Sequence, residues 1–193
     1  MKTTQLVSLG LVAVATAACG GGTAKLATTQ TAPKAPAGNV AAAGSASTPG
    51  RCATANLSVR LGAAGGAAGS TYEPVVFTNK GSTTCTLDGY PGVAFVAPQT
   101  GKQVGAAASR NAQHAGSLVT LAAGASASAM LQVVNHANFP ASTCSPTTVS
   151  GLRVYPPGAT TAAYVAFTHA QQACSTSVNQ LTVQAVVAGP SGM

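Results

Sequence analysis

Hydrophobic and polar residues alternate along most of the chain after residue 50, with the two-residue period that is typical of β-strands. Leu57, Val59 and Leu61, for example, alternate with Ser58 and Arg60. The pattern predicts strands over residues 57–61, 72–79, 92–97, 118–121, 127–133, 152–154, 164–168 and 178–187, with flexible loops at 62–69 and 106–116. Roughly eight short strands separated by turn residues favour an all-β fold, an antiparallel two-sheet β-sandwich of the immunoglobulin-like type.

The first 18 residues have a different pattern, which is typical of a secretory signal peptide. Lys2 supplies a positive charge, an apolar stretch covers residues 6–15, and small residues lead to Cys19. The apolar stretch is shorter than the 20 or so residues that a membrane-spanning helix needs. We therefore expect residues 1–18 to be a signal peptide and the rest of the chain to be exported.

Small residues directly before a cysteine, as before Cys19, resemble the bacterial lipobox. This resemblance predicts that the thiol of Cys19 is acylated and anchors the protein to the cell membrane, where several acyl chains hold stably. The alternative is cleavage by an ordinary signal peptidase after Ala17 or Ala18, which would leave a free thiol. Cys19 is the odd one of five cysteines, which favours the lipid anchor.

Residues 20–50 lack an apolar period and an aromatic residue, and they contain three prolines. Such a segment cannot bury enough surface to offset the entropy of ordering it. We expect residues 19–50 to form the lipidated cysteine and a disordered tether, with a reach of roughly 30 Å for a flexible chain of this length. Its Thr, Ser and Pro content would also suit O-glycosylation, although a bare spacer is the simpler interpretation. The folded domain is expected at residues 51–193.

Four further cysteines lie in the predicted domain: Cys52, Cys85, Cys144 and Cys174. In an exported domain they imply two disulfides, with three possible pairings. Cys52 precedes the first predicted strand and Cys85 follows the second, so antiparallel pairing of these strands brings both cysteines to one end. The same reasoning joins Cys144 to Cys174. We therefore expect Cys52–Cys85 and Cys144–Cys174, and the lack of a CxxC pair argues against a zinc site.

The charge of the chain argues against nucleic acid as a partner. The chain contains nine basic and two acidic residues, which gives a formal net charge of +7, but the basic residues are scattered singly along the sequence. Nucleic-acid-binding domains usually concentrate basic residues in a patch. A scattered positive charge is compatible with weak attraction to anionic lipid or wall polymer.

Few residues offer catalytic or metal chemistry. The only carboxylates are Glu73 and Asp88, and nothing in their spacing predicts that they converge. A Ser/His/Asp triad would need a serine in a nucleophile-elbow context, which the chain lacks. A copper site would have to gather Met130 with the three histidines, His114, His136 and His169, whose spacings follow no ligand motif. We expect neither an enzyme nor a cofactor.

A more specific pattern covers residues 85–93. The string Cys-Thr-Leu-Asp-Gly-Tyr-Pro-Gly-Val, preceded by Phe-Thr-Asn-Lys-Gly at 77–81, resembles the hallmark of an actinobacterial lipoprotein domain catalogued as domain of unknown function 4232. The later strings at 121–125 and 152–158 fit the same family, and the match covers about residues 52–187. The resemblance implies a fold and an extracytoplasmic address, and no catalytic residue.

The centre of this motif reads as a turn. It contains Asp88, Gly89, Tyr90, Pro91 and Gly92. The two glycines permit a positive φ and the proline restricts the chain to a turn. Tyr90 is expected to pack as an aromatic cap on the sandwich rather than to form a ligand platform.

These observations favour a cell-envelope lipoprotein that acts as a non-catalytic binding or interaction module. Its partners would be the membrane, through the lipid anchor, and wall glycan or another exported protein. The alternative is a structural coat or spacer lipoprotein without a specific ligand, which the low aromatic content suits. A third hypothesis, an envelope metal carrier, requires the histidines and Met130 to converge.

Overall fold

The computed structural model describes residues 48–113 and 115–192 of the chain. The predicted signal peptide (1–18), Cys19, most of the predicted tether and His114 lie outside the described residues. Among the residues described, no helix is long and apolar enough to cross a membrane. The described part of the chain is mostly β, as expected, with three sheets in which nearly all strand pairs are antiparallel.

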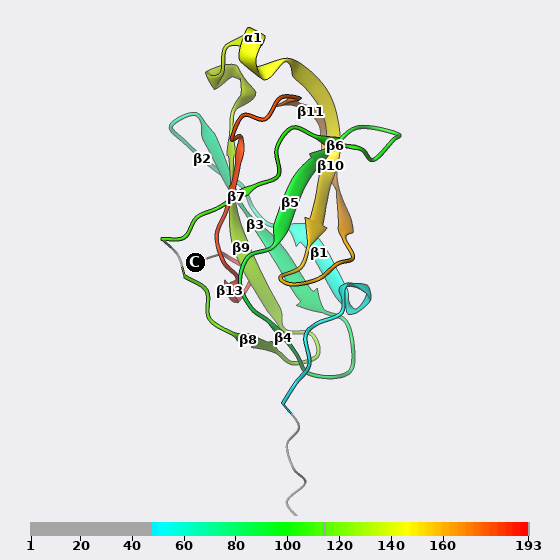
Figure 1. Ribbon diagram of the computed structural model, residues 1–193. Helices are drawn as coiled ribbons and strands as arrows, with labels where there is room; N and C mark the ends of the chain where they lie inside the picture. The colour runs from blue at the N-terminus through cyan, green and yellow to red at the C-terminus, as the bar shows by residue number, and fades with distance from the viewer. Residues whose placement is uncertain (1–47, 114, 193) are drawn as a thin grey trace, which may run out of the picture. The chain divides into compact units, whose positions relative to one another are not determined.

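The largest sheet has seven strands, built around the long antiparallel pair of β3 (Ser70–Asn79) and β9 (Ser126–Val134) (Figure 1). Its other strands are β1 (Leu57–Leu61), β2 (Gly65–Ala67), β7 (Ser109–Arg110), β12 (Leu181–Val183) and β13 (Val187–Ala188). β1 and β2 pair with β3, and β12 and β13 pair with β9. The pairing of β7 with β12 is parallel.

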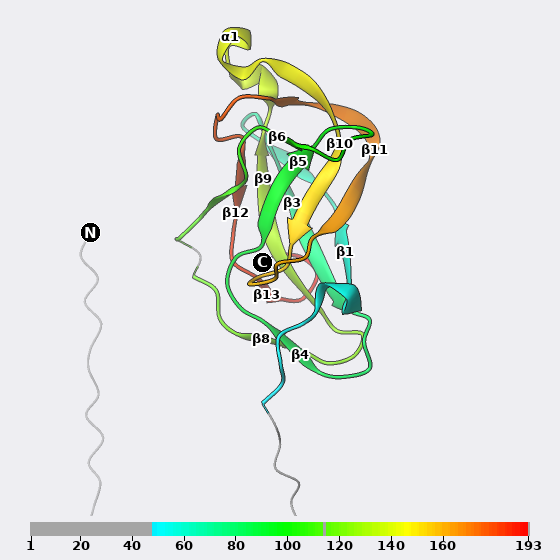
Figure 2. The same ribbon diagram turned by 45° about the vertical axis from the view of Figure 1, so that its right-hand side comes forward.

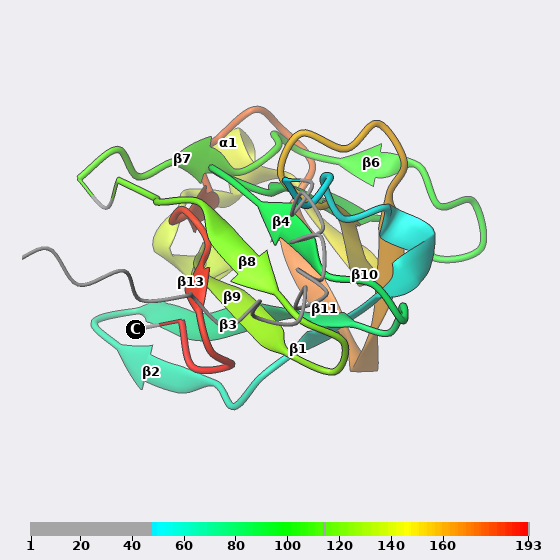
Figure 3. The same ribbon diagram turned by 90° about the horizontal axis from the view of Figure 1, so that it is seen from below.

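The second sheet has four strands in the order β11-β10-β5-β6. They are β5 (Gly92–Val96), β6 (Gln103–Val104), β10 (Pro146–Tyr155) and β11 (Ala163–Cys174). Figure 2 shows β5 and β10 in front of β3 and β9. A third, two-stranded sheet pairs β4 (Cys85–Leu87) with β8 (Val119–Leu121), which lie side by side in Figure 3. Short helices cover Thr54–Asn56 (η1), His136–Asn138 (η2) and Ala141–Cys144 (α1).

One cluster of buried apolar side chains contains residues of all three sheets. Phe77 on β3 and Leu131 on β9 are fully buried, together with Leu152 on β10 and Leu121 on β8. Each belongs to the inward-facing row of an alternating strand, so the two-residue period of the sequence directly produces the core. The side chains of this cluster are mostly small, because many of the inward positions are alanine or valine.

Several elements differ from the sequence-based predictions. The loop predicted at 62–69 contains β2, which forms a hairpin with β3, because Ala68 and Gly69 both take the positive φ that a tight two-residue turn needs. The loop at 106–116 contains β7. The strand predicted over 178–187 is divided into β12 and β13, because the Val186 amide leaves β9 to donate to the Gly89 carbonyl. β4 and β6 were not predicted, and the cores of the strands that were predicted are present.

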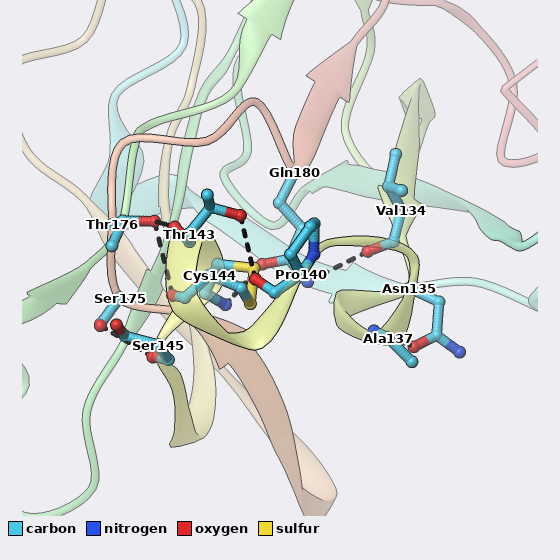
Figure 4. The surroundings of a disulfide bond; sticks show 11 residues. Val134, Asn135, Ala137, Pro140, Thr143, Cys144, Ser145, Ser175, Thr176 and Gln180 are labelled. Carbon is cyan, nitrogen blue, oxygen red and sulfur yellow. Dashed lines mark hydrogen bonds between the residues drawn. A yellow bond between two sulfur atoms is a disulfide. The ribbon is translucent and has the colours of Figure 1, made fainter.

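Two disulfides join Cys52 to Cys85 and Cys144 to Cys174, the pairs expected from the sequence. The antiparallel pairing that this expectation used is present: β1 pairs with β3, and β10 pairs with β11. Cys144 lies in α1 (Figure 4), and Cys174 ends β11. The Gln180 side chain accepts from the Cys174 amide and donates to the Val134 carbonyl, so this crosslink is tied to β9 as well.

Candidate functional site

The turn at residues 88–92 leads from β4 into β5, at the edge of the two-stranded sheet. Pro91 is buried and Asp88 is exposed, and Gly89 has a φ of 92°, as the turn prediction requires. The Tyr90 hydroxyl donates to the Asn111 carbonyl at 3.3 Å, and the Arg110 guanidinium lies 5.7 Å from the centre of its ring. Tyr90 is therefore half-buried and held by β7, a position that favours a structural contact.

Gly92 does not follow the prediction. It begins β5 with no positive φ, and it lies directly opposite Tyr155 of β10. A Cβ at Gly92 would contact the Tyr155 side chain at 3.4 Å. A contact of this length is an ordinary van der Waals contact, so neither the backbone conformation nor the space at this position requires a glycine.

Asn79, in the motif at 77–81, is a buried polar side chain with 1% of its surface exposed. Its amide donates to the carbonyls of Thr83 and Leu121, and its carbonyl accepts from the Gly81 amide. These partners are all backbone groups: those of Gly81 and Thr83 lie in the loop between β3 and β4, and that of Leu121 lies on β8. A buried amide with this many partners stabilises the connection and is not open to a ligand.

The outer face of the four-stranded sheet carries a second tyrosine, which is the strongest candidate for a binding residue. Tyr164 on β11 lies opposite Arg153 on β10 and is 58% exposed. Among the residues described, Tyr164 and Leu118 are the two exposed large hydrophobic residues. Cross-strand partners stand about 5 Å apart at Cβ, and both of these side chains line the same hollow.

The Tyr164 ring is fixed in place although it is exposed. Its hydroxyl donates to the Ser150 carbonyl at 3.0 Å, and the ring lies across Gly151. A Cβ at Gly151 would stand 2.8 Å from a ring carbon of Tyr164 and would overlap the Val165 carbonyl oxygen. The missing side chain of Gly151 therefore makes the space that the Tyr164 ring occupies.

Arg153 is also held. Its guanidinium donates to the Gly101 carbonyl in the loop between β5 and β6. A hollow of about 260 Å³ lies between this loop and β11, lined by Val96, Gly101, Arg153 and Tyr164 among others. We call Tyr164, Arg153 and this hollow the sheet platform. It combines an exposed ring, a fixed cation and an apolar floor, which are the features that recur in binding hot spots.

A family comparison decides what kind of domain carries this platform. The family model described as "Domain of unknown function (DUF4232)" matches residues 52–187. The chain belongs to the DUF4232 family. The matched span runs from the first cysteine of the Cys52–Cys85 disulfide to the first residue of β13. No curated protein and no solved structure matches the chain.

The two carboxylates of the DUF4232 domain lie on different elements. Asp88 is exposed in the turn before β5, whereas Glu73 lies on β3 and is half-buried. Partial burial raises the pKa of the Glu73 carboxyl above its ordinary value, because desolvation disfavours the charged form. Glu73 lines a groove between β1 and β11, together with Arg60 and Phe167. The sequence placed Glu73 at a strand entry and did not reveal this groove.

The residues considered for metal binding lie on three different elements. Met130 is on β9, His136 in η2 and His169 on β11. Within 48–113 and 115–192, no three His, Cys, Asp or Glu side chains gather closely enough to hold a metal ion. The His169 ring contacts the neighbouring Thr168 hydroxyl at 3.1 Å and is exposed.

Proposed function

We propose that this protein is an extracytoplasmic lipoprotein whose DUF4232 domain is a non-catalytic binding module for wall glycan. Residues 1–18 act as the signal peptide, Cys19 carries the lipid, residues 19–50 form the tether, and residues 51–193 form an immunoglobulin-like sandwich of the two larger sheets. The two disulfides support the address, because such bonds persist outside the reducing cytoplasm. The shared core cluster supports the sandwich.

The sheet platform is the observation that carries the binding function. A pyranose ring has a face of C–H groups that packs against the negative face of an aromatic ring. Tyr164 offers such a face to solvent, and its hydrogen bond to Ser150 removes the entropy that a mobile side chain would lose on binding. Arg153 beside it supplies hydrogen-bond donors for hydroxyl or carboxylate oxygens of the sugar.

Co-sedimentation of the purified domain with insoluble cell-wall material tests this proposal. We expect the wild-type domain to pellet with the wall, and Tyr164→Ala to weaken binding by roughly 30-fold, the loss typical of a hot-spot residue. Tyr164→Phe keeps the ring and should retain most of the binding. Leu118→Ala, which removes the other exposed apolar side chain, serves as the matched control.

Equal binding by Tyr164→Ala and the wild type would overturn the role of the platform. No binding by the wild type would overturn the glycan-binding function and favour a coat or spacer protein. Circular dichroism of each variant establishes that the substitutions leave the fold intact.

The anchor is tested separately in a bacterial host that processes lipoproteins. We expect the wild-type chain to fractionate with membranes, and Cys19→Ala to appear in the soluble fraction. Mass spectrometry of the mature N-terminus should find an acylated Cys19. An unmodified Cys19 thiol would overturn the anchor while leaving the binding function open to its own test.

A further inference from the structure

A second groove on the described part of the domain lies where the edge strands β1 and β11 meet, and none of its lining residues belongs to the sheet platform. It has a volume of about 400 Å³. Its walls include Arg60 and Leu61 from β1, Glu73 from β3, and Phe167, Thr168 and Gln171 from β11.

An irregularity of β11 opens this groove. Val149 pairs with Gln171 but Gly151 pairs with Ala166, so residues 167–170 stand opposite Ser150 alone. Extra residues of this kind leave part of the strand unpaired and bend it. Phe167 turns back toward the core and meets Phe95 edge to face at 6.3 Å between ring centres. Phe167 and Thr168, which lie in this unpaired stretch, therefore line the groove next to the paired residues Val165 and Ala166.

Glu73 lies on the inward-facing row of β3. The same row continues through Val75 and Phe77, both fully buried, and Glu73 stands opposite the buried Leu131. A carboxylate in such a row occupies a position that the strand pattern reserves for an apolar side chain. Burial costs a carboxylate its hydration, and that cost is offset only by a counter-charge or by hydrogen bonds.

The part of the domain that the structure describes offers the Glu73 carboxylate no such compensation: it makes no hydrogen bond or ion pair there. Arg60 lines the groove from the outward-facing row of β1, and its guanidinium donates to the Leu61 carbonyl at 3.5 Å. His169, next to Thr168 on the bulge, is the nearest titratable group along β11 and is exposed. The carboxylate thus lines a groove of mixed polar and apolar residues, and it makes no hydrogen bond or ion pair with the described part of the domain.

We propose that the β1–β11 groove binds a primary alkyl ammonium, the chemistry of a lysine side chain. The ammonium would pair with Glu73, and its remaining protons would meet oxygen atoms of Thr168 and Gln171. The alkyl stem would lie along Leu61 and Phe167, whose ring face attracts a cation. The proposal goes beyond the glycan-binding function and does not depend on it, because the two sites use different residues.

Binding is measured by NMR chemical-shift titration of the purified domain at pH 7 with Nα-acetyl-lysine methylamide. We expect saturable shifts in the β1 and β11 amides, and at least tenfold weaker binding to Glu73→Gln, which keeps the shape of the side chain and removes its charge. Asp88→Asn removes the other carboxylate of the described domain and should bind as the wild type does. The ligand acetylated at Nε lacks the charge and should not bind.

Three outcomes would overturn the proposal: no saturable binding, equal binding by Glu73→Gln, or equal weakening by Asp88→Asn, which would indicate general charge attraction. A parallel titration with cadaverine separates the two sources of such a group. Tighter binding of the capped lysine favours a peptide partner, and tighter binding of cadaverine favours a free amine. Tyr164→Ala should bind the amine normally, so failure of the glycan site does not affect this test.

Discussion

Removal of the Cys144–Cys174 disulfide should lower the free energy of unfolding of this domain by about 4 kcal/mol. The crosslink spans 30 residues of sequence. Without it the unfolded chain gains the entropy of an open loop of that length, which corresponds to roughly 3.6 kcal/mol at 25 °C in the chain-entropy treatment. Because both cysteines are buried, replacement by alanine also removes the packing of two sulfur atoms, which adds up to about 1 kcal/mol.

The measurement is equilibrium unfolding in urea of the double variant Cys144→Ala/Cys174→Ala, followed by circular dichroism. A loss of about 4 kcal/mol is a large part of the roughly 5–15 kcal/mol that holds a typical domain folded. In a thermal scan it should lower the melting temperature by about 10 °C for a domain of this size. The variant should still fold, because the antiparallel ladder of β10 and β11 and the core cluster remain.

The second disulfide supplies the control. Cys52–Cys85 spans 33 residues, so the same treatment predicts almost the same loss for Cys52→Ala/Cys85→Ala. A loss below about 1 kcal/mol in both variants would refute the view that the crosslinks stabilise this small aliphatic core. Dithiothreitol should lower the stability of the wild type and leave a variant without either disulfide unchanged.

Two further predictions concern single residues. Glu73→Gln should be more stable than the wild type at pH 7. Burial raises the pKa of Glu73 in the folded state, so protonation of this carboxyl favours the fold. The wild type should therefore lose stability as the pH rises from about the ordinary pKa of 4.5 through the raised pKa, whereas Glu73→Gln should not. Urea unfolding of both proteins between pH 4 and 8 measures the difference in stability, and parallel curves would contradict the prediction. Gly151→Ala should lower the free energy of unfolding by about 1–3 kcal/mol and displace the Tyr164 ring, because a Cβ at residue 151 has no room. Ala166→Gly, at the position paired with Gly151, is the control. Unchanged tyrosine fluorescence and an unchanged unfolding midpoint in Gly151→Ala would refute the close contact.

The strands that form the core could be predicted from the sequence, because their inward rows are apolar and their outward rows are polar. β1 and β9 are clear examples, and the disulfide pairing followed from the order of such strands. β4 escaped prediction because all three of its residues are buried and show no alternation. β2 escaped because glycine and alanine carry no period, and its pairing depends on the backbone at Ala68 and Gly69.

Neither candidate site could be read from the sequence. The sheet platform requires the register that places Tyr164 opposite Arg153, and these residues are separated by a loop whose length does not determine that register. The groove requires the four-residue bulge of β11, which has no signature in its composition. Glu73 was visible as one of two carboxylates, but its position in the inward row became apparent only from the pairing of β3 with β9.

The entry of the chain into the domain has a mechanical consequence. The Gly50 carbonyl accepts from the Thr86 amide, and the Cys52 amide donates to the Thr86 carbonyl, both at 2.9 Å. The Cys52–Cys85 disulfide joins the same two segments next to these hydrogen bonds. A pull on the residues that precede Gly50 would load these two hydrogen bonds first and then a covalent bond, before any tension reached β1. Under oxidising conditions the first strand is therefore shielded from forces that the preceding segment transmits.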